Sequence, residues 1–400
     1  MSEWKEYRLG DLGVVLTGKT PSIKNPEDWG NEMLFVTPSD YKNYSKYADD
    51  SERKLSQVGI NRFENKVLPL RSILVTCIGS DMGKVAMASK KCVTNQQINS
   101  IIPNSIVDAD FLYYKLISSH KIIRQLGQGG SAVPILNKGS FENITITLPP
   151  LEEQKRIADI LSALDDKIEL NRRINENLEQ QAQALFKHWF VDFAPFKDNN
   201  FIESEIGMIP KGWRVVELGD VTTITKDKVG NRSDVKVLSP ISTGELMLSE
   251  EYFNKQVFSE SIAKYILVRP NSFAYNPARI NIGSIGRNTF DFDGCVSPVY
   301  VVFECEKGYH YFFDLYRRLS IFKEEVIKRS IGGVRQTLNY TDFSLIKVVY
   351  PPLNVVSKFN VLYEHLLQYK KLNSRENEYL SNLRDILLPK LMSGELNIDE

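Results

Sequence analysis

Hydrophobic positions recur with helical spacing over two long stretches that contain no internal proline or glycine. The first runs from Leu151 to about Trp189, and the second runs from Leu353, 202 residues later, to about Leu388. One position in seven in each stretch is apolar or asparagine, which is the repeat of a coiled-coil seam. These seam positions are Ile157, Leu164, Asn171, Leu178 and Leu185, then Phe359, Leu366, Asn373, Leu380 and Leu387. We predict two long helices that pair with each other; the alternative is long surface helices, each packed on its own domain.

Other segments repeat as well, which indicates that the chain contains a duplicated half. The segments Leu170–Leu178 and Leu372–Leu380 are identical at six of nine positions and keep the offset of 202 residues. A Leu-Gly-Asp triplet preceded by tryptophan opens each half, with its leucine at Leu9 and at Leu218. The two halves are therefore expected to fold alike.

The rest of each half has a mixed pattern, in which short β-type runs alternate with turn residues and precede one helical run. The β-type runs are Ile73–Ile78, Lys84–Ala88, Ile98–Ile102 and Val296–Cys305. The helical runs extend from the N-cap Asp108 to Leu126, with Gly127 as the stop, and from about Tyr309 to Arg329. We predict an α+β protein with globular domains at 1–150 and 211–352, long helices at 151–190 and 353–400 (the latter including the C-terminal tail), and a linker at 191–210.

Composition narrows the class of protein. With 42% hydrophobic and 25% charged residues, no apolar run near 18 residues and no signal peptide, the chain is expected to be a cytoplasmic protein of more than one domain. Its four cysteines lack CxxC spacing and its four histidines are scattered, so reduced thiols and no metal site are expected. Formal charge is zero overall, and the counts by segment give the globular parts a small positive excess. That excess is compatible with a nucleic-acid face and equally with ordinary solvated charge.

One segment matches a nucleotide-binding motif, but its context does not. The residues Gly13–Thr20 satisfy the phosphate-loop pattern GxxxxGK[ST]. That loop should follow a buried strand and begin a helix, yet β-branched residues fill it and Pro21 follows at once. Likewise, Asn276 and Pro277 match only the first half of an amino-methylating signature. We therefore predict a binding protein without chemistry of its own, and keep nucleotide hydrolysis at Gly13–Thr20 as an alternative.

Taken together, several motifs resemble the specificity subunit of type I restriction-modification systems. They are the tryptophan-preceded Leu-Gly-Asp openings, Pro149–Ile157, Trp189–Phe193, Ile209–Trp213 and Leu387–Leu396. The likeness extends over essentially all 400 residues. One departure is that Leu353–Phe359 lacks the Glu-Glu-Gln-Lys sequence found at the start of the first long helix.

The resemblance implies a function in DNA recognition. Two target-recognition domains would each read one half of a bipartite site in double-stranded DNA, spaced by an antiparallel pair of helices with pseudo-twofold symmetry. Two modification subunits that methylate adenine with S-adenosylmethionine would bind, together with restriction subunits, which are motor-nucleases that use ATP and magnesium. No cofactor is then expected on this chain. A specificity subunit of a modification-only methyltransferase is the nearer alternative.

Polar residues in loops near glycine are the candidates for base contact, because backbone can approach DNA there and amide or guanidinium groups can pair with base edges. In the first half they are Thr20, Ser39, Lys84, Asn95, Gln96, Gln97 and Gln128. In the second half they are Ser242, Asn276, Arg279, Asn281, Arg287, Arg335 and Gln336. We also expect Asn171 and Asn373, which occupy matching seam positions, to meet near the pseudo-twofold axis.

Overall fold

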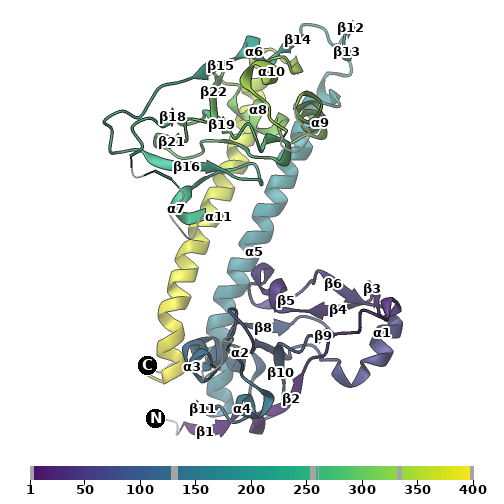
Figure 1. The fold of residues 1–400 in the computed structure, drawn as a ribbon, viewed down its shortest axis with the longest axis vertical. Coiled ribbons are helices and arrows are strands. Elements are labelled where there is room, and N and C mark those ends of the chain that lie inside the picture. Colours follow the sequence, from purple (N-terminus) through teal and green to yellow (C-terminus); the bar gives the residue numbers. More distant parts are fainter. Residues whose placement is uncertain (1–3, 128–133, 253–257, 260, 331–335, 397–400) are drawn as a thin grey trace. The chain divides into compact units, whose positions relative to one another are not determined.

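The computed structural model describes residues 4–127, 134–252, 258, 259, 261–330 and 336–396. It divides into two compact units, one made of residues 1–174 and 371–400 and the other of residues 175–370. Both units mix helices and strands (Figure 1), which confirms the predicted α+β class. The division falls inside both long helices.

Two sheets make up most of the first unit: a five-stranded sheet in the order β2-β10-β7-β8-β5 and a four-stranded sheet in the order β3-β6-β4-β9. Strands β1 and β11 form a separate antiparallel pair. The bounds are β1 Lys5–Arg8, β2 Gly13–Thr17, β3 Trp29–Gly30, β4 Met33–Val36, β5 Tyr47–Ala48, β6 Arg53–Leu55, β7 Ile73–Thr76, β8 Val85–Ala88, β9 Cys92–Thr94, β10 Ile98–Pro103 and β11 Thr145–Leu148.

Helices α1 (Gln57–Arg62), α2 (Ala109–Ser118), α3 (His120–Gly127) and α4 (Lys138–Glu142) complete the globular part of this unit. Asp108 is the N-cap of α2, as predicted, and its side chain accepts a hydrogen bond from the Phe111 backbone N–H. The single helix predicted from 108 to 126 is interrupted at Ser119. The hydroxyls of Ser118 and Ser119 both donate to the Lys115 carbonyl, and such bonds bend a helix.

The second unit has two four-stranded sheets, β15-β22-β19-β20 and β17-β16-β21-β18, and the antiparallel pairs β12-β13 and β14-β23. The strand bounds are β12 Phe201–Ser204, β13 Gly207–Pro210, β14 Arg214–Glu217, β15 Thr222–Thr225, β16 Lys236–Pro240, β17 Leu246–Leu248, β18 Ile266–Val268, β19 Phe273–Tyr275, β20 Ile285–Arg287, β21 Gly294–Val296, β22 Val301–Cys305 and β23 Lys347–Tyr350. The predicted strand 296–305 thus contains a turn, residues 297–300.

The helices of the second unit's globular part are α6 (Leu218–Val221), α7 (Ser249–Tyr252), α8 (His310–Tyr316), α9 (Ser320–Arg329) and α10 (Tyr340–Ser344). The predicted helix 309–329 is interrupted between α8 and α9, because Arg317 and Arg318 turn into polar contacts described below. The core of the second unit is rich in aromatic side chains, among which Phe273 and Phe303 stack with ring centroids 5.3 Å apart.

Corresponding contacts occur where the two halves begin. The backbone N–H of Leu9 donates to Ile144 over 2.9 Å, and that of Leu218 donates to Ile346 over 2.9 Å. Asn137 and Asn339 both cap short helices through their side-chain oxygens. Leu9 and Leu218 belong to the repeated Leu-Gly-Asp triplets, so the two triplets make the same kind of backbone contact.

The long helices are α5 (Leu151–Phe190) and α11 (Leu353–Ser393), and α11 continues past Leu388, where the proline- and glycine-free run of the second half ends. The second continues through Pro389, where the sequence pattern predicted a stop. Its last turn is anchored instead by packing, since Leu391 and Met392 are buried in the core of the first unit. The ammonium of Lys115 also donates to the Met392 carbonyl over 2.8 Å.

Within each unit the long helices contact each other in opposite directions. In the first, Asp165 pairs with Arg384 over 2.7 Å, and further along α5 the amide of Asn171 meets Asn377, earlier on α11. In the second, Glu179 pairs with Lys370 over 2.9 Å, and Phe186 packs on Phe359. All ten predicted seam residues are buried or half-buried.

The partner of Asn171 differs from the expected one. Asn171 is fully buried, and its amide donates to Glu376 Oε2 (2.6 Å) and Asn377 Oδ1 (3.0 Å) rather than to Asn373. With a repeat of 202 residues, Asn377 is the mate of Asn175. The observed partner is therefore four positions further along α11 than the expected one, because the packing of the two helices sets their register.

Among the described residues, no helix is long and apolar enough to cross a membrane. All four cysteines are free, and burial raises the pKa of Cys77 and Cys92 to about 12.

Candidate nucleic-acid interface

In the first unit the candidate residues gather where two parallel strands end. Strands β4 and β9 are parallel, with Val36 beside Thr94, so their carboxyl ends reach the same edge of the sheet. The residues that follow them are Thr37–Asp40 and Asn95–Gln97. The Asn95 backbone N–H donates to the Val36 carbonyl over 3.1 Å, which holds the two loops together.

A third segment, Gly18–Thr20, completes this edge. Lys19 N–H donates to the Thr94 carbonyl over 2.9 Å and Gly18 N–H to the Ile98 carbonyl over 3.2 Å. A Cβ on Gly18 would lie 2.2 Å from two backbone oxygens, so only glycine permits this approach. The Thr20 hydroxyl lies 2.6 Å from Gln96 Oε1, so these two candidates touch.

Members of this group differ in their availability to a ligand. Ser39 and Gln96 are exposed and Thr20 is half-buried, whereas Asn95 is buried and donates its amide to Gln97 Oε1 over 2.9 Å. Asn95 therefore supports the loop from inside.

The other two candidates of the first half have different positions. Lys84 is in the turn between β7 and β8, where its ammonium pairs with Asp81 over 2.7 Å. It also lines a cavity of about 320 Å³ with His120 and Arg384. Gln128 lies outside the described residues.

The second unit forms an edge of the same kind. Strands β16 and β21 are parallel, and the loops that follow them are 241–244 and 297–300. With the loop 276–284, they surround a cavity of about 450 Å³. Three candidates line this cavity, namely Ser242, Asn276 and Arg279.

Two more candidates meet beside this cavity's third loop, because Asn281 donates its amide to Gln336 Oε1 over 3.3 Å. Arg335 lies outside the described residues. The cavity also has lining residues that sequence reasoning missed, Ser297 and Tyr300, and Val299 between them is 71% exposed. Pro298 was the available signal for this turn, because proline rarely continues a central strand.

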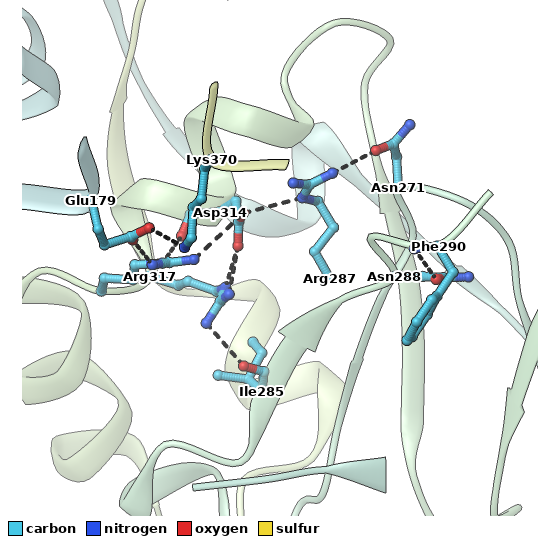
Figure 2. A network of polar contacts seen from close by, with 10 residues as sticks. Glu179, Asn271, Ile285, Arg287, Asn288, Phe290, Asp314, Arg317 and Lys370 are labelled. Atoms are coloured by element: carbon cyan, nitrogen blue, oxygen red, sulfur yellow. Dashed lines mark hydrogen bonds and ion pairs between the residues drawn. The ribbon is translucent and has the colours of Figure 1, made fainter. Parts of the chain in front are cut away.

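The structure contradicts the prediction that Arg287 contacts bases, because its guanidinium lies in the interior of the second unit. Its Nε donates to Asp314 Oδ2 over 3.1 Å, and its Nη1 donates to Asn271 Oδ1 over 2.6 Å (Figure 2). Only 6% of the residue is exposed. Burial alone would raise the pKa of Asp314, but Arg317 and Arg287 hold that pKa well below its ordinary value. Arg287 is thus held by an ionised aspartate rather than presented at the surface.

The phosphate-loop pattern does not form a phosphate loop. Residues Gly13–Thr17 are strand β2, which pairs with β10 along its whole length. The next helical element is a single 3-10 turn at Pro26–Asp28, and Gly18–Thr20 belongs to the edge described above. No helix N-terminus therefore follows to hold a phosphate.

Comparison with known proteins defines the family. The model of the type I restriction modification DNA specificity domain matches residues 1–180. The type I restriction enzyme MjaIX specificity subunit of Methanocaldococcus jannaschii is 30% identical over 417 residues, covering all of this chain and 94% of that protein. The HindI specificity subunit of Haemophilus influenzae is 38% identical over 180 residues, which is 43% of this chain and 39% of that protein.

A solved structure agrees in fold. The type I restriction-modification S subunit from M. genitalium superposes with a TM-score of 0.60 at 15% identity, covering 98% of this chain and 96% of that one. The chain belongs to the specificity subunits of type I restriction enzymes. The resemblance drawn from the sequence motifs is thereby confirmed, and DNA sequence recognition is the role of this family.

Proposed function

We propose that each globular part reads one half of a bipartite DNA target through the edge at which its parallel strands end. The observation that carries this proposal is the recurrence of polar side chains at the same edge in both units, on Thr20 and Gln96 in one and on Ser242 and Arg279 in the other. Amide groups suit adenine and guanidinium suits guanine, so these side chains can read bases in the major groove.

The long helices are proposed to act as an antiparallel coiled-coil spacer between two duplicated recognition domains. Support comes from the opposite direction of α5 and α11 within each unit and from the seam residues, all of which are buried or half-buried. A polar residue in such a seam, here Asn171, is the known way to specify register at some expense of stability.

A second apolar stripe on α11 supports docking of modification subunits. Leu372, Tyr379 and Ile386 recur every seven residues and are 59%, 67% and 59% exposed. On α5 in the same unit, Leu170 and Ile174 are 52% and 39% exposed. A heptad of exposed apolar residues on a helix whose other face is already packed fits a helical partner. We assign this stripe to contacts with two modification subunits.

The chain itself is proposed to be non-catalytic and to bind no cofactor. S-adenosylmethionine would belong to the modification subunits, and ATP with magnesium to restriction subunits. Nucleotide hydrolysis at Gly13–Thr20 loses its support because Gly13–Thr17 is a paired strand and no α-helix follows Thr20 to hold a phosphate. A modification-only system remains the alternative, and it is distinguished by whether a restriction subunit co-purifies with the chain.

Mapping methylated adenines in DNA from cells that express the chain with its modification subunit tests the proposal. We expect a motif of two specified halves separated by an unspecified spacer. Exchanging residues 1–148 for those of a relative should change one half only. Change in both halves, or a motif without a spacer, would contradict modular recognition.

Partner docking is tested separately by co-purification. Tyr379→Asp places a charge in the exposed stripe and should reduce capture of the modification subunit by roughly tenfold or more, as expected for a central interface residue. Val58→Asp is the matched control, because Val58 is a 48% exposed apolar residue on helix α1 of the same unit. Equal capture by both variants would place the docking surface elsewhere.

A further inference from the structure

Three charged side chains are buried together in the second unit, beside the candidate recognition cavity. Asp314 on α8 is 2% exposed and accepts hydrogen bonds from Arg287 (3.1 Å) and from Arg317 Nε (3.0 Å), as Figure 2 shows. Arg317 itself is 5% exposed. Charges removed from water are tolerated only when each is paired in good geometry, so this cluster fixes the positions of the groups that it joins.

Arg317 extends from the cluster to two of the loops that line the cavity. Its Nη1 donates to the Ile285 carbonyl over 2.9 Å, at the end of the loop 276–284. The same nitrogen lies against the turn 241–244, since a Cβ on Gly244 would be 2.8 Å from it. One guanidinium therefore lies against the turn 241–244 and bonds the first residue of β20, directly after the loop 276–284.

Arg287 holds the other side of the loop 276–284. This loop connects strands β19 and β20, and Arg287 is the last residue of β20. Its Nη1 donates to Asn271, which has a φ of 69° in the turn that precedes β19. Arg287 thus links the end of β20 to Asp314 and to the turn that precedes β19.

The polar contacts continue from this cluster to the long helices within the same unit. Arg318, next to Arg317, pairs with Glu179 on α5, and Glu179 pairs with Lys370 on α11 over 2.9 Å. The loops of the cavity are therefore connected to both helices through charged groups.

We propose that Arg317 is a positioning residue for sequence recognition in the second unit. Held by Asp314, it sets the separation between the loops that carry Ser242 and Arg279, and thereby the alignment of these side chains with base edges. The inference rests on the proposed function, because it concerns how well one half-site is read. Arg317 itself makes no base contact.

The experiment compares Arg317→Lys with Arg269→Lys in the full chain, co-expressed with its modification subunit. Lysine keeps the charge beside Asp314 but loses the fork that also reaches the Ile285 carbonyl. Arg269 is the matched control, since it is an arginine of the same unit paired with Asp227 and Glu304 at the surface. Methylation mapping gives the discrimination at each position of both half-sites.

We expect Arg317→Lys to lower discrimination at one half-site by about tenfold, which is the effect of losing one base contact, and to leave the other half-site unchanged. Arg269→Lys should leave both unchanged. A uniform fall in methylation with both half-sites intact would show that Arg317 contributes to stability alone, and would overturn the proposal.

A second variant keeps the proposal testable if Arg317→Lys does not fold. Gly244→Ala retains every charge of the cluster. Its Cβ would lie 2.8 Å from the same guanidinium, and the φ of 85° at this position also strains alanine in the turn 241–244. It should relax the same half-site, and full discrimination in this variant would also refute the proposal. A wild-type map without two half-sites would instead refute the proposed function.

Discussion

Substituting Gly18 by alanine tests the recognition edge of the first unit directly. The new Cβ would lie 2.2 Å from the backbone oxygens of both Thr94 and Asn95. Ordinary carbon–oxygen contacts begin near about 3.3 Å, so the segments must separate by roughly 1 Å. Because the obstructing atoms are backbone, no side-chain rotation can relieve the contact.

The magnitude follows from what that separation breaks. The Gly18 N–H bond to Ile98 in β10, at 3.2 Å, and the Lys19 N–H bond to Thr94 in β9, at 2.9 Å, would lengthen beyond hydrogen-bonding distance. Two lost bonds at about 1 kcal/mol each, with residual crowding of about 1–2 kcal/mol, give a destabilisation of about 3 kcal/mol. For a unit of about 200 residues this corresponds to a fall in melting temperature of about 6–12 °C.

Gly139→Ala is the control, because its Cβ would meet only Asn137 Oδ1 at 3.6 Å, within helix α4. Alanine there should stabilise by about 0.5–1 kcal/mol. Thermal unfolding gives the stabilities, and methylation mapping at a permissive temperature gives the half-sites. We expect Gly18→Ala to alter one half-site because Thr20 and Gln96 separate. Wild-type melting and an unchanged motif would refute the reasoning.

Three further outcomes are expected. Replacing Asn171 and Asn377 together with leucine removes a buried amide group, and the Asn171 oxygen has no hydrogen-bond partner among the described residues. Calorimetry should therefore show a free energy of unfolding that is higher by about 1 kcal/mol, and a lower value would contradict this. Burial lowers the pKa of Lys115 from 10.5 to about 8, so the unfolded chain binds more protons between these values and stability should rise as pH increases from 8 to 10.5. Lys115→Met should abolish that rise in a pH series of melting curves, and its persistence would show that another group titrates. One heptad inserted into each long helix adds about 10 Å, so the mapped target should gain about three spacer base pairs; an unchanged spacer would show that the helices do not set it.

Local sequence patterns were sufficient for the secondary structure that depends on neighbouring residues. The absence of proline and glycine with a seven-residue repeat identified both long helices, and Asp108 identified a helix start. These features act within one or two helical turns, so the pattern contains the whole cause. Local patterns also fail where packing opposes them. Proline usually ends a helix, but α11 continues through Pro389, because burial of Leu391 and Met392 outweighs one lost backbone hydrogen bond.

The sequence by itself determined the long helices and the mixed α+β class, since periodicity can be recognised without knowing any long-range contact. Tertiary structure alone decided which candidates face outward. In the sequence, Arg287 and Arg279 both looked like arginines in loops. In the structure, Arg287 forms a buried ion pair with Asp314, whereas Arg279 lines the cavity. The partner of Asn171 likewise depended on the register of two helices some 200 residues apart in the chain. The physical reason is that charge pairing and register are set by packing between distant segments, whose energies no local pattern records.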